Sequence, residues 1–418
     1  MNEESTTGKS ASCRLCGEPL EHMMLDLGMS PPCQNRVYAH QLNHMEAFYP
    51  LRVFLCESCF LVQLEEYVAP ENIFDDYAYF SSYSESWVRH AANYVDMISG
   101  RLDLDESSKV VELASNDGYL LQHFVQKSIP CMGVEPAANV AAAAQEKGVP
   151  TTVSFFGEDT AKKVRAEFGA ADLIVGNNVL AHVPDLNDFV AGIKCLLAPG
   201  GVVTMEFPHL QRLFEENQFD TIYHEHFSYF SFVVANEVFR RHGMTLFDVD
   251  ELKSHGGSIR IYGRHEDDDS KPVLDSVTQL IERETGKGYL DTAIYDAFAD
   301  KVCATKRELL AFLIEKKNEG KTIAGYGAPG KGNTLLNYCG IREDFLDYTV
   351  DISPHKQNTF TPGTHIPVHS PDKLKETRPD YILILPWNLK DEIVSSNGFV
   401  AEWGGQWVVP IPSVQVVG

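Results

Sequence analysis

The stretch KVVELASNDGYLLQHF, residues 109–124, decides the fold class. It is typical of a buried strand, a turn rich in Ser, Asn, Asp and Gly, and the start of a helix. Three more strand signals follow, in CMGVEP (131–136), ADLIVGNNVLAHVPDL (171–186) and LLAPGGVVTMEFP (196–208). Strands that alternate with helices predict a parallel sheet with helices on both faces, and such α/β sheets bind ligands at the carboxyl ends of their strands.

Polar side chains follow the first three of these strands and form a candidate cofactor pocket. Acids at the ends of the first two strands suit ribose hydroxyls and an ammonium group, and they disfavour a pyrophosphate. S-adenosylmethionine (SAM) carries those groups, whereas NAD has no ammonium. Tyr77 and Phe80 are expected either to wall this cofactor or to be ordinary packing residues. The predicted cofactor-binding residues in and after the strands are Glu112, Asn116, Asp117, Gly118, Glu135, Asn177 and Asn178.

Two C-x-x-C pairs near the N-terminus predict a zinc site. Cys13 and Cys16 form the first pair, and Cys56 and Cys59 form the second. Two thiolates from each tight turn complete a closed tetrahedral Cys₄ site of the structural kind. The 39 residues between the pairs exceed the usual spacing of about 15–20, so a small subdomain must be looped out. Cys33 is either a substitute ligand or a buried thiol.

Composition limits the class of protein. A chain of 418 residues is expected to form two or three domains. The net charge of −24, with no cluster of Lys and Arg, argues against nucleic-acid binding. No apolar run approaches the ~18 residues of a membrane span, and the nine cysteines suit a reducing compartment, so we expect a cytoplasmic protein with no membrane partner. The oligomeric state is left open, and a monomer is compatible with the sequence.

The C-terminal third predicts a second α/β unit behind a long amphipathic helix over 292–320. GYGAPG, residues 325–330, follows a strand signal and opens a helix, and Asp351 lies 21 residues beyond its last glycine. This pattern is typical of a dinucleotide site. Lys331 and Asn333, which follow the turn, suit a phosphate of almost any nucleotide.

The segment YHEHFSYFS, residues 223–231, concentrates ionisable groups between aromatic flanks. Its histidines are two positions apart, which is not the spacing of a helical zinc site. A straight strand would place Tyr223 and His226 on opposite faces. If both act on one substrate, the segment must be a twisted loop.

These motifs occur in a fixed order along nearly the whole chain. From the N-terminus they are the two C-x-x-C pairs, ELASNDGYLL, GVEPA, NNVLAHVPDL, YHEHFSYFS, HGGSIR, GYGAPGKGNTLLNYCGI and DISPHKQNTFTPGTHIPV. As an ordered set they resemble the sugar C-methyltransferases that act on nucleotide-linked 4-keto deoxysugars, a family that includes the C-3′ enzyme of tetronitrose biosynthesis.

The resemblance implies a three-part enzyme. Residues 1–70 would bind structural zinc, residues 71–275 would form a Rossmann-like class I methyltransferase domain, and residues 276–418 would form a Rossmann-like domain that binds the nucleotide-sugar. His226 would be the catalytic base, with Tyr223 and Glu225 beside it. His182 matches a further active-site histidine of the family, although a histidine that only bonds to backbone is the plain alternative.

Substrate contacts are expected from two places. His255 and Gly256, in SHGGS, either allow close approach to the sugar or form a plain turn into a strand. In the C-terminal unit, Lys331, Asn333, Lys356 and Asn358 are candidate phosphate or base contacts.

The function that follows is SAM-dependent C-methylation of a nucleoside-diphosphate 4-keto-6-deoxysugar, with dTDP as the expected nucleotide. His226 would remove the proton beside the keto group, Tyr223 would stabilise the enolate oxygen, and the enolate carbon would attack the SAM methyl. Two alternatives remain: an NAD-dependent nucleotide-sugar oxidoreductase or epimerase that uses GYGAPG, and a non-catalytic zinc scaffold.

Overall fold

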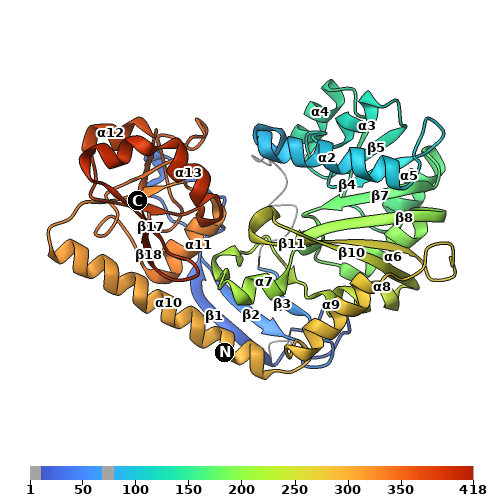
Figure 1. The fold of residues 1–418 in the computed structure, drawn as a ribbon, viewed down its shortest axis with the longest axis horizontal. Coiled ribbons are helices and arrows are strands. Elements are labelled where there is room, and N and C mark those ends of the chain that lie inside the picture. The colour runs from blue at the N-terminus through green and yellow to red at the C-terminus, as the bar shows by residue number, and fades with distance from the viewer. Residues whose placement is uncertain (1–10, 68–79, 418) are drawn as a thin grey trace, which may run out of the picture. The chain divides into compact units, whose positions relative to one another are not determined.

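The computed structural model describes residues 11–67 and 80–417 (Figure 1). The chain divides into two compact units. Unit 1 comprises Met1–Leu20, Cys56–His209 and Phe227–Leu290, and unit 2 comprises Glu21–Leu55, Leu210–His226 and Asp291–Gly418. Within the described ranges, no helix has both the length and the apolarity that a membrane crossing requires.

Unit 1 contains a seven-stranded, mostly parallel sheet. Five neighbouring strands are parallel, and β11 is antiparallel to its neighbours β8 and β10. The four strands expected from sequence are all present, and the antiparallel pair at one edge was not foreseen. In spatial order the strands are β10 (Met244–Leu252), β11 (Ser258–His265), β8 (Leu197–Pro208), β7 (Ala171–Asn177), β4 (Val110–Leu113), β5 (Cys131–Glu135) and β6 (Thr151–Val153).

The helices of unit 1 begin at side-chain caps in three cases. The side chains of Ser84, Asp185 and Ser231 accept hydrogen bonds from the first turns of α2, α6 and α8, which satisfies backbone donors that the helix leaves unpaired. The helices are α2 (Glu85–Arg101), α3 (Leu121–Gln126), α4 (Ala138–Glu146), α5 (Glu158–Glu167), α6 (Leu186–Leu196), α8 (Phe232–Arg241) and α9 (Asp275–Gly286). A short ladder of β3 (Val62–Leu64) and β9 (Ser228–Tyr229) also belongs to this unit.

One hydrophobic core of unit 1 joins α2 to the sheet. Tyr94, Val95 and Ile98 of α2 are almost fully buried together with Phe124 of α3 and Val110 of β4. This packing fixes the face of α2 against the strand that leads into the candidate cofactor turn.

Unit 2 contains a second α/β sheet, also of seven strands. Its five central strands are parallel, and an antiparallel strand closes each edge. In spatial order they are β14 (Thr359–Phe360), β15 (Pro367–His369), β13 (Thr349–Val350), β12 (Ile323–Tyr326), β16 (Tyr381–Ile384), β17 (Gln406–Val409) and β18 (Gln415–Val417). The helices are α7 (Leu210–Glu215), α10 (Ala293–Asn318), α11 (Gly330–Cys339), α12 (Asp372–Thr377) and α13 (Lys390–Ser396).

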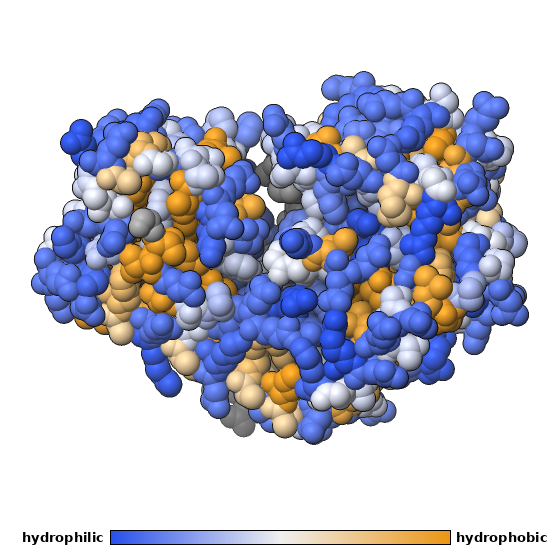
Figure 2. Space-filling view, viewed as in Figure 1, coloured by the Kyte–Doolittle hydropathy of each residue, from blue (hydrophilic) through white to orange (hydrophobic). Residues whose placement is uncertain are grey.

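The segment between the two cysteine pairs folds as an antiparallel hairpin of β1 (His22–Ser30) and β2 (Tyr49–Leu55). It belongs to unit 2, whereas the cysteine pairs themselves belong to unit 1. Short 3₁₀ helices complete the chain: η1 (Ala39–Gln41), η2 (Ser81–Tyr83), η3 (Leu180–His182), η4 (Phe219–Thr221), η5 (Ser254–Gly256), η6 (Trp387–Leu389) and η7 (Gly398–Trp403). On the face that Figure 2 shows, hydrophilic side chains predominate and hydrophobic ones are interspersed, as the net charge of −24 leads one to expect.

Candidate active site

The four cysteines of the two C-x-x-C pairs converge in unit 1. Their sulfur atoms all lie within 4.8 Å of one another, with 3.5 Å between Cys13 and Cys59 and 3.4 Å between Cys16 and Cys56. Tetrahedral zinc with bonds of about 2.3 Å needs sulfur atoms about 3.8 Å apart, so the cluster fits this ion. The hydrogen bond between Cys59 and Cys13 lowers the pKa of Cys13 to about 4 and raises the pKa of Cys59, so the two thiols share a proton that zinc binding would release.

One further residue supports this metal centre, and one candidate ligand is excluded from it. Gln63 of β3 donates to the sulfur of Cys13 at 3.2 Å, and outer-shell donors of this kind orient a metal ligand. Nothing in the sequence singled out Gln63. Cys33 is not a fifth or substitute ligand, because it lies in unit 2, where its thiol faces Glu225.

The turn after β4 has the strained backbone of a ligand-binding loop. Ala114, Asn116 and Gly118 all have positive φ, at 53°, 49° and 74°. The first two lack the freedom of glycine, so each conformation costs on the order of 1–2 kcal/mol, and such strain is concentrated at functional sites. Gly118 also has no room for a side chain, because an added Cβ would lie 3.1 Å from Val149.

Three buried carboxyl groups surround this turn. Glu112 is 1% exposed, and its one side-chain contact of a hydrogen-bonding kind among the described residues is with Tyr119. Burial, reinforced by Glu135 and Asp117, raises the pKa of Glu112 well above its usual range. Glu135 accepts from the backbone N–H of Asn116 and of Ala137, both at 2.9 Å. A buried acid beside two others suits a cationic ligand that carries hydroxyl groups.

The amides that follow β7 belong to the same edge of the sheet. Asn177 ends β7, and Asn178 has a φ of 54° and donates its backbone N–H to the carbonyl oxygen of Glu206 at 2.7 Å. The side-chain nitrogen of Asn177 and the side-chain oxygen of Asn178 have no partner among the described residues. Phe80 stacks on Tyr83 at 5.3 Å and immediately precedes Ser81, whose N–H donates to the Asn116 side chain at 2.9 Å. Tyr77 lies outside the described residues.

The chemistry of these side chains and of this turn matches the groups that SAM carries. The strained turn allows close backbone approach, Glu135 can accept from ribose hydroxyls, and Glu112 can pair with a positive charge. The turn residues Asn116, Asp117 and Gly118 complete the set, of which Asp117 is in addition paired with Lys147 at 3.0 Å.

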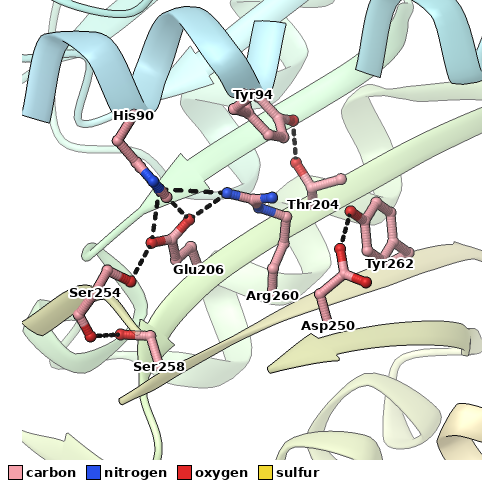
Figure 3. Close-up of polar contacts among 9 residues, drawn as sticks. All are labelled: His90, Tyr94, Thr204, Glu206, Asp250, Ser254, Ser258, Arg260 and Tyr262. Atoms are coloured by element: carbon pink, nitrogen blue, oxygen red, sulfur yellow. Dashed lines mark hydrogen bonds and ion pairs between the residues drawn. The ribbon is translucent and has the colours of Figure 1, made fainter. Parts of the chain in front are cut away.

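A polar cluster that the sequence did not predict lies at the carboxyl end of β8 (Figure 3). At its centre Glu206 is fully buried and accepts hydrogen bonds from Arg260 at 2.5 Å, from His90 at 3.0 Å and from Ser254 at 2.7 Å. Burial opposes ionisation of Glu206, but the hydrogen bond from His90 and the positive charge of Arg260 prevail and lower its pKa to about 2. Glu206 is therefore a carboxylate at neutral pH.

Two histidines of unit 1, His182 and His255, were predicted from the sequence as site residues. His182 ends η3, where its N–H donates to the carbonyl oxygen of Val179 at 2.8 Å. His255 lies in η5 with a φ of 55°, and Gly256 follows it with a φ of 93°. The His255 ring meets the ring of Trp87 edge-on at 4.8 Å.

In unit 2, the segment Tyr223–His226 forms a turn, as the catalytic hypothesis required. The backbone N–H of His226 donates to the carbonyl oxygen of Tyr223 at 2.9 Å, and the two rings lie 4.2 Å apart. The imidazole Nδ1 donates to the carbonyl oxygen of Thr221 at 3.1 Å, which leaves Nε2 as the basic nitrogen. The side chains of Tyr223 and His226 therefore lie together.

The other ionisable groups of this turn are buried. Glu225 is 5% exposed and accepts a hydrogen bond from the thiol of Cys33 at 3.7 Å. Burial raises the pKa of Glu225 to about 7. His224 contacts the carbonyl oxygen of Pro50 at 3.2 Å, and burial lowers its pKa.

The predicted substrate contacts of unit 2 lie around the glycine-rich turn and β13. Lys331 bonds to Asn388 at 2.8 Å, and its ammonium lies over the ring of Trp387 at 4.4 Å. Asn333 donates to the carbonyl oxygen of Cys33 at 2.7 Å, so one of its groups is already bound within the unit. Lys356 pairs with Asp351 at 3.3 Å, and Asn358 has a φ of 61°.

The acid expected to take a ribose hydroxyl in a dinucleotide site is already engaged. Asp351 accepts from the backbone N–H of Ala328 at 2.8 Å and of Ser353 at 2.9 Å. An added Cβ on Gly330 would lie 3.0 Å from the sulfur of Cys33, so the start of α11 packs closely against Cys33 within unit 2.

Comparisons with known proteins agree with this architecture. Residues 13–74 match the model of a zinc binding domain, residues 87–248 that of a methyltransferase domain, and residues 253–412 that of a C-methyltransferase C-terminal domain. The C-methyltransferase NovU of Streptomyces niveus is 35% identical over 408 residues, which are 97% of this chain and 96% of that protein.

Two solved structures of methyltransferases each align with less than half of the chain. A SAM-dependent methyltransferase from Clostridium acetobutylicum is 12% identical, with 43% of this chain and 92% of that chain covered and a TM-score of 0.35. A second, from Thermotoga maritima, is 18% identical, with coverage of 45% and 96% and a TM-score of 0.34. From the match to NovU and the three domain models, the chain belongs to the family of SAM-dependent C-methyltransferases with an N-terminal zinc-binding domain.

Proposed function

We propose that this C-methyltransferase acts on a nucleoside-diphosphate 4-keto-6-deoxysugar, with dTDP as the nucleotide, and that His226 is its catalytic base. The observation that supports this most is the geometry of the Tyr223–His226 turn. A carbon beside a carbonyl group becomes nucleophilic only when its proton leaves, so the reaction needs a base and a donor for the enolate oxygen. The turn holds an imidazole and a phenol with their rings 4.2 Å apart.

The roles of the residues follow from their bonds. The Nδ1–H of His226 is held by the Thr221 carbonyl oxygen, so Nε2 takes the proton from the carbon. The hydroxyl of Tyr223 donates to the oxygen on which negative charge develops, a contribution of about 3–4 kcal/mol in comparable oxyanion sites. Glu225, largely protonated below about pH 7, orients this turn through its buried contact with Cys33.

The cofactor supplies an electrophilic methyl group on a sulfonium centre, and the carbon deprotonated by His226 forms the new C–C bond as the thioether leaves. Glu112, Glu135, Asp117 and the strained turn hold that cofactor in unit 1. In unit 2, we assign Lys331, Asn333, Lys356 and Asn358 to the nucleotide-sugar, because they gather amide and ammonium groups at the glycine-rich turn and β13. His255 and Gly256 are assigned to the sugar, and His182 is assigned to the active site as a second histidine.

Deuterium exchange tests the base separately from methyl transfer. The probe is dTDP-4-keto-6-deoxyglucose, incubated in D₂O with S-adenosylhomocysteine (SAH) and the full-length protein. We expect wild type to exchange the hydrogen beside the keto group, and His226→Gln to slow this exchange by about 100-fold or more. His224→Gln, two positions away with its ring on a backbone carbonyl, is the matched control.

Two results would contradict the proposal in different ways. Exchange at the wild-type rate in His226→Gln would remove this residue as the base. If the protein binds SAM but adds a methyl group to no member of a panel of keto-sugar nucleotides, the substrate class is wrong while the cofactor assignment stands.

A further inference from the structure

The cluster around Glu206 lies at the edge of the sheet where the cofactor residues are found. In the register of the sheet, Glu206 of β8 lies between Asn177 of β7 and Arg260 of β11. Glu206 is ionised, and Arg260 is 5% exposed with its guanidinium on Glu206 and over the ring of Tyr94 at 4.5 Å. The charge of Arg260 is therefore neutralised inside the protein.

His90 of α2 is the outer member of this cluster (Figure 3). Its side chain is 27% exposed, and its contacts with Glu206 are made by Nε2, at 3.0 Å from both carboxylate oxygens. Because an ionised carboxylate only accepts, the proton of the ring lies on Nε2. A second proton would then sit on Nδ1, and Glu206 would be a counter-charge that the ring shares with Arg260, whose Nη2 lies 3.4 Å from Nε2.

The face of α2 that carries His90 lies against the cofactor turn. Trp87, one helical turn earlier, stacks on His90 at 4.8 Å and 13°. The same indole stacks on Tyr119 at 6.0 Å, and Tyr119 directly follows Gly118 of the strained turn. Trp87 thus connects the imidazole to the loop that we assign to the cofactor.

The charges of the candidate cofactor pocket are unbalanced. Glu112, Asp117 and Glu135 suit the hydroxyl groups and the positive charges of SAM, but none of them can receive its carboxylate. Lys147 is paired with Asp117, and Arg260 is paired with Glu206. His90 lies beside the pocket and can carry a positive charge. The hydrogen bonds described above are all made by its Nε2, which leaves Nδ1 for a ligand.

We infer that His90, oriented by Glu206 and Arg260, binds the carboxylate at the amino-acid end of SAM through Nδ1–H. Glu206 and Arg260 are positioning residues in this arrangement, since they act only through the ring of His90. The inference rests on SAM binding by unit 1 and not on the identity of the methyl acceptor.

Two ligands that differ in the amino-acid end provide the test. SAH carries the carboxylate, and 5′-methylthioadenosine keeps the nucleoside and the thioether but lacks the amino-acid end. Calorimetry on the full-length, zinc-loaded protein measures the Kd of each ligand. In His90→Gln we expect SAH to bind about tenfold or more weakly, as for loss of a charge-assisted hydrogen bond, while the Kd of 5′-methylthioadenosine is unchanged.

Two further variants make the test specific. His265→Gln is the matched control. His265 is the last residue of β11, the strand that also carries Arg260, and its ring bonds to the carbonyl oxygen of Leu197. Glu206→Gln should lower the preference for SAH over 5′-methylthioadenosine although His90 is intact. If Glu206→Gln does not fold, the His90→Gln result decides alone.

Either of two outcomes overturns the inference. Equal weakening of both ligands in His90→Gln would mean that His90 only shapes the pocket. Unchanged binding of both would mean that His90 does not contact the cofactor. Because neither ligand is the methyl acceptor, both outcomes are distinct from a failure of the proposed substrate.

Discussion

Replacing Glu225 with glutamine is expected to remove a defined part of the pH dependence of unit 2 stability. Glu225 is 5% exposed, its described side-chain partner is the weakly donating thiol of Cys33, and burial raises its pKa from 4.5 to about 7. Between these two pH values the folded protein keeps a proton that the unfolded chain has lost. Stability therefore falls as pH rises, and the fall ends just above the folded pKa.

The size of this effect follows from the two pKa values. The full contribution of a shift from 4.5 to about 7 is on the order of 3 kcal/mol. Near pH 5 the protein approaches its isoelectric point, so a window from about pH 6 to about pH 8.5 is preferable. Over that window the linkage relation gives a loss of about 1.4 kcal/mol that wild type shows and Glu225→Gln does not.

The assay can be confined to unit 2 because of where the tryptophans lie. Trp387, Trp403 and Trp407 belong to unit 2, and Trp87 belongs to unit 1. In a Trp87→Phe background, urea unfolding followed by tryptophan fluorescence reports on unit 2 alone. Comparing the same protein with and without Glu225→Gln at each pH isolates the one carboxyl group.

Asp220 makes this comparison necessary, because burial also raises its pKa to about 7 and it contributes a fall of the same sign. That contribution cancels in the difference between the two proteins. Glu343→Gln, at an exposed position of the same unit, should leave the pH dependence unchanged. A Glu225→Gln protein whose stability falls with pH as steeply as the wild type would refute the argument from burial.

Three other changes have outcomes that the structure predicts. Removal of zinc by a chelator should release one ion per chain and make the four cysteines of the Cys13 cluster reactive to a thiol reagent, as metal analysis and thiol titration would show. Gly118→Ala should cost about 1–2 kcal/mol and weaken SAM binding in calorimetry, because φ is 74° and the new methyl group would crowd Val149. Glu284→Gln should destabilise unit 1 by about 3 kcal/mol or more in calorimetric unfolding, since this buried carboxylate accepts from His209 at 2.5 Å and from the first two N–H groups of α8 at 2.8 Å.

The parts of the fold that the sequence predicted are those that depend on short, continuous segments of the chain. The strands that end near Glu112 and Glu135 are runs of buried residues. Acids are rare in such strands, so these two indicate a ligand site. The two cysteine pairs were equally local, since each C-x-x-C turn needs only four residues. Both predictions were confirmed by the strand topology and by the convergence of the four sulfur atoms.

What could not be predicted depends on contacts between distant segments. Glu206, His90 and Arg260 meet because α2 packs on the sheet and β11 pairs antiparallel with β8, and no local pattern encodes that register. The contact of Cys33 with Glu225 joins residues that are 192 positions apart. The looped-out segment was foreseen from the cysteine spacing, but its place in unit 2 was not.

Two glutamates show why residue type alone cannot assign chemistry. Glu206 and Glu225 are both buried, yet their pKa values are about 2 and about 7. The difference lies in their partners, because Glu206 faces the guanidinium of Arg260 and the imidazole of His90, whereas Glu225 has a thiol.

The consequence concerns the proposed base. A carboxylate beside a histidine orients the ring and stabilises the imidazolium, and in unit 1 Glu206 can do this for His90. In the Tyr223–His226 turn Nδ1 of His226 is instead held by the neutral carbonyl oxygen of Thr221, and Glu225 itself carries a proton over much of the neutral range. A carbonyl oxygen orients the ring, but it stabilises the positive charge gained with the substrate's proton less than a carboxylate would. On this account the acidity of the keto-sugar and the phenol of Tyr223, rather than an unusually strong base, must drive deprotonation, so Tyr223→Phe should slow exchange as severely as His226→Gln.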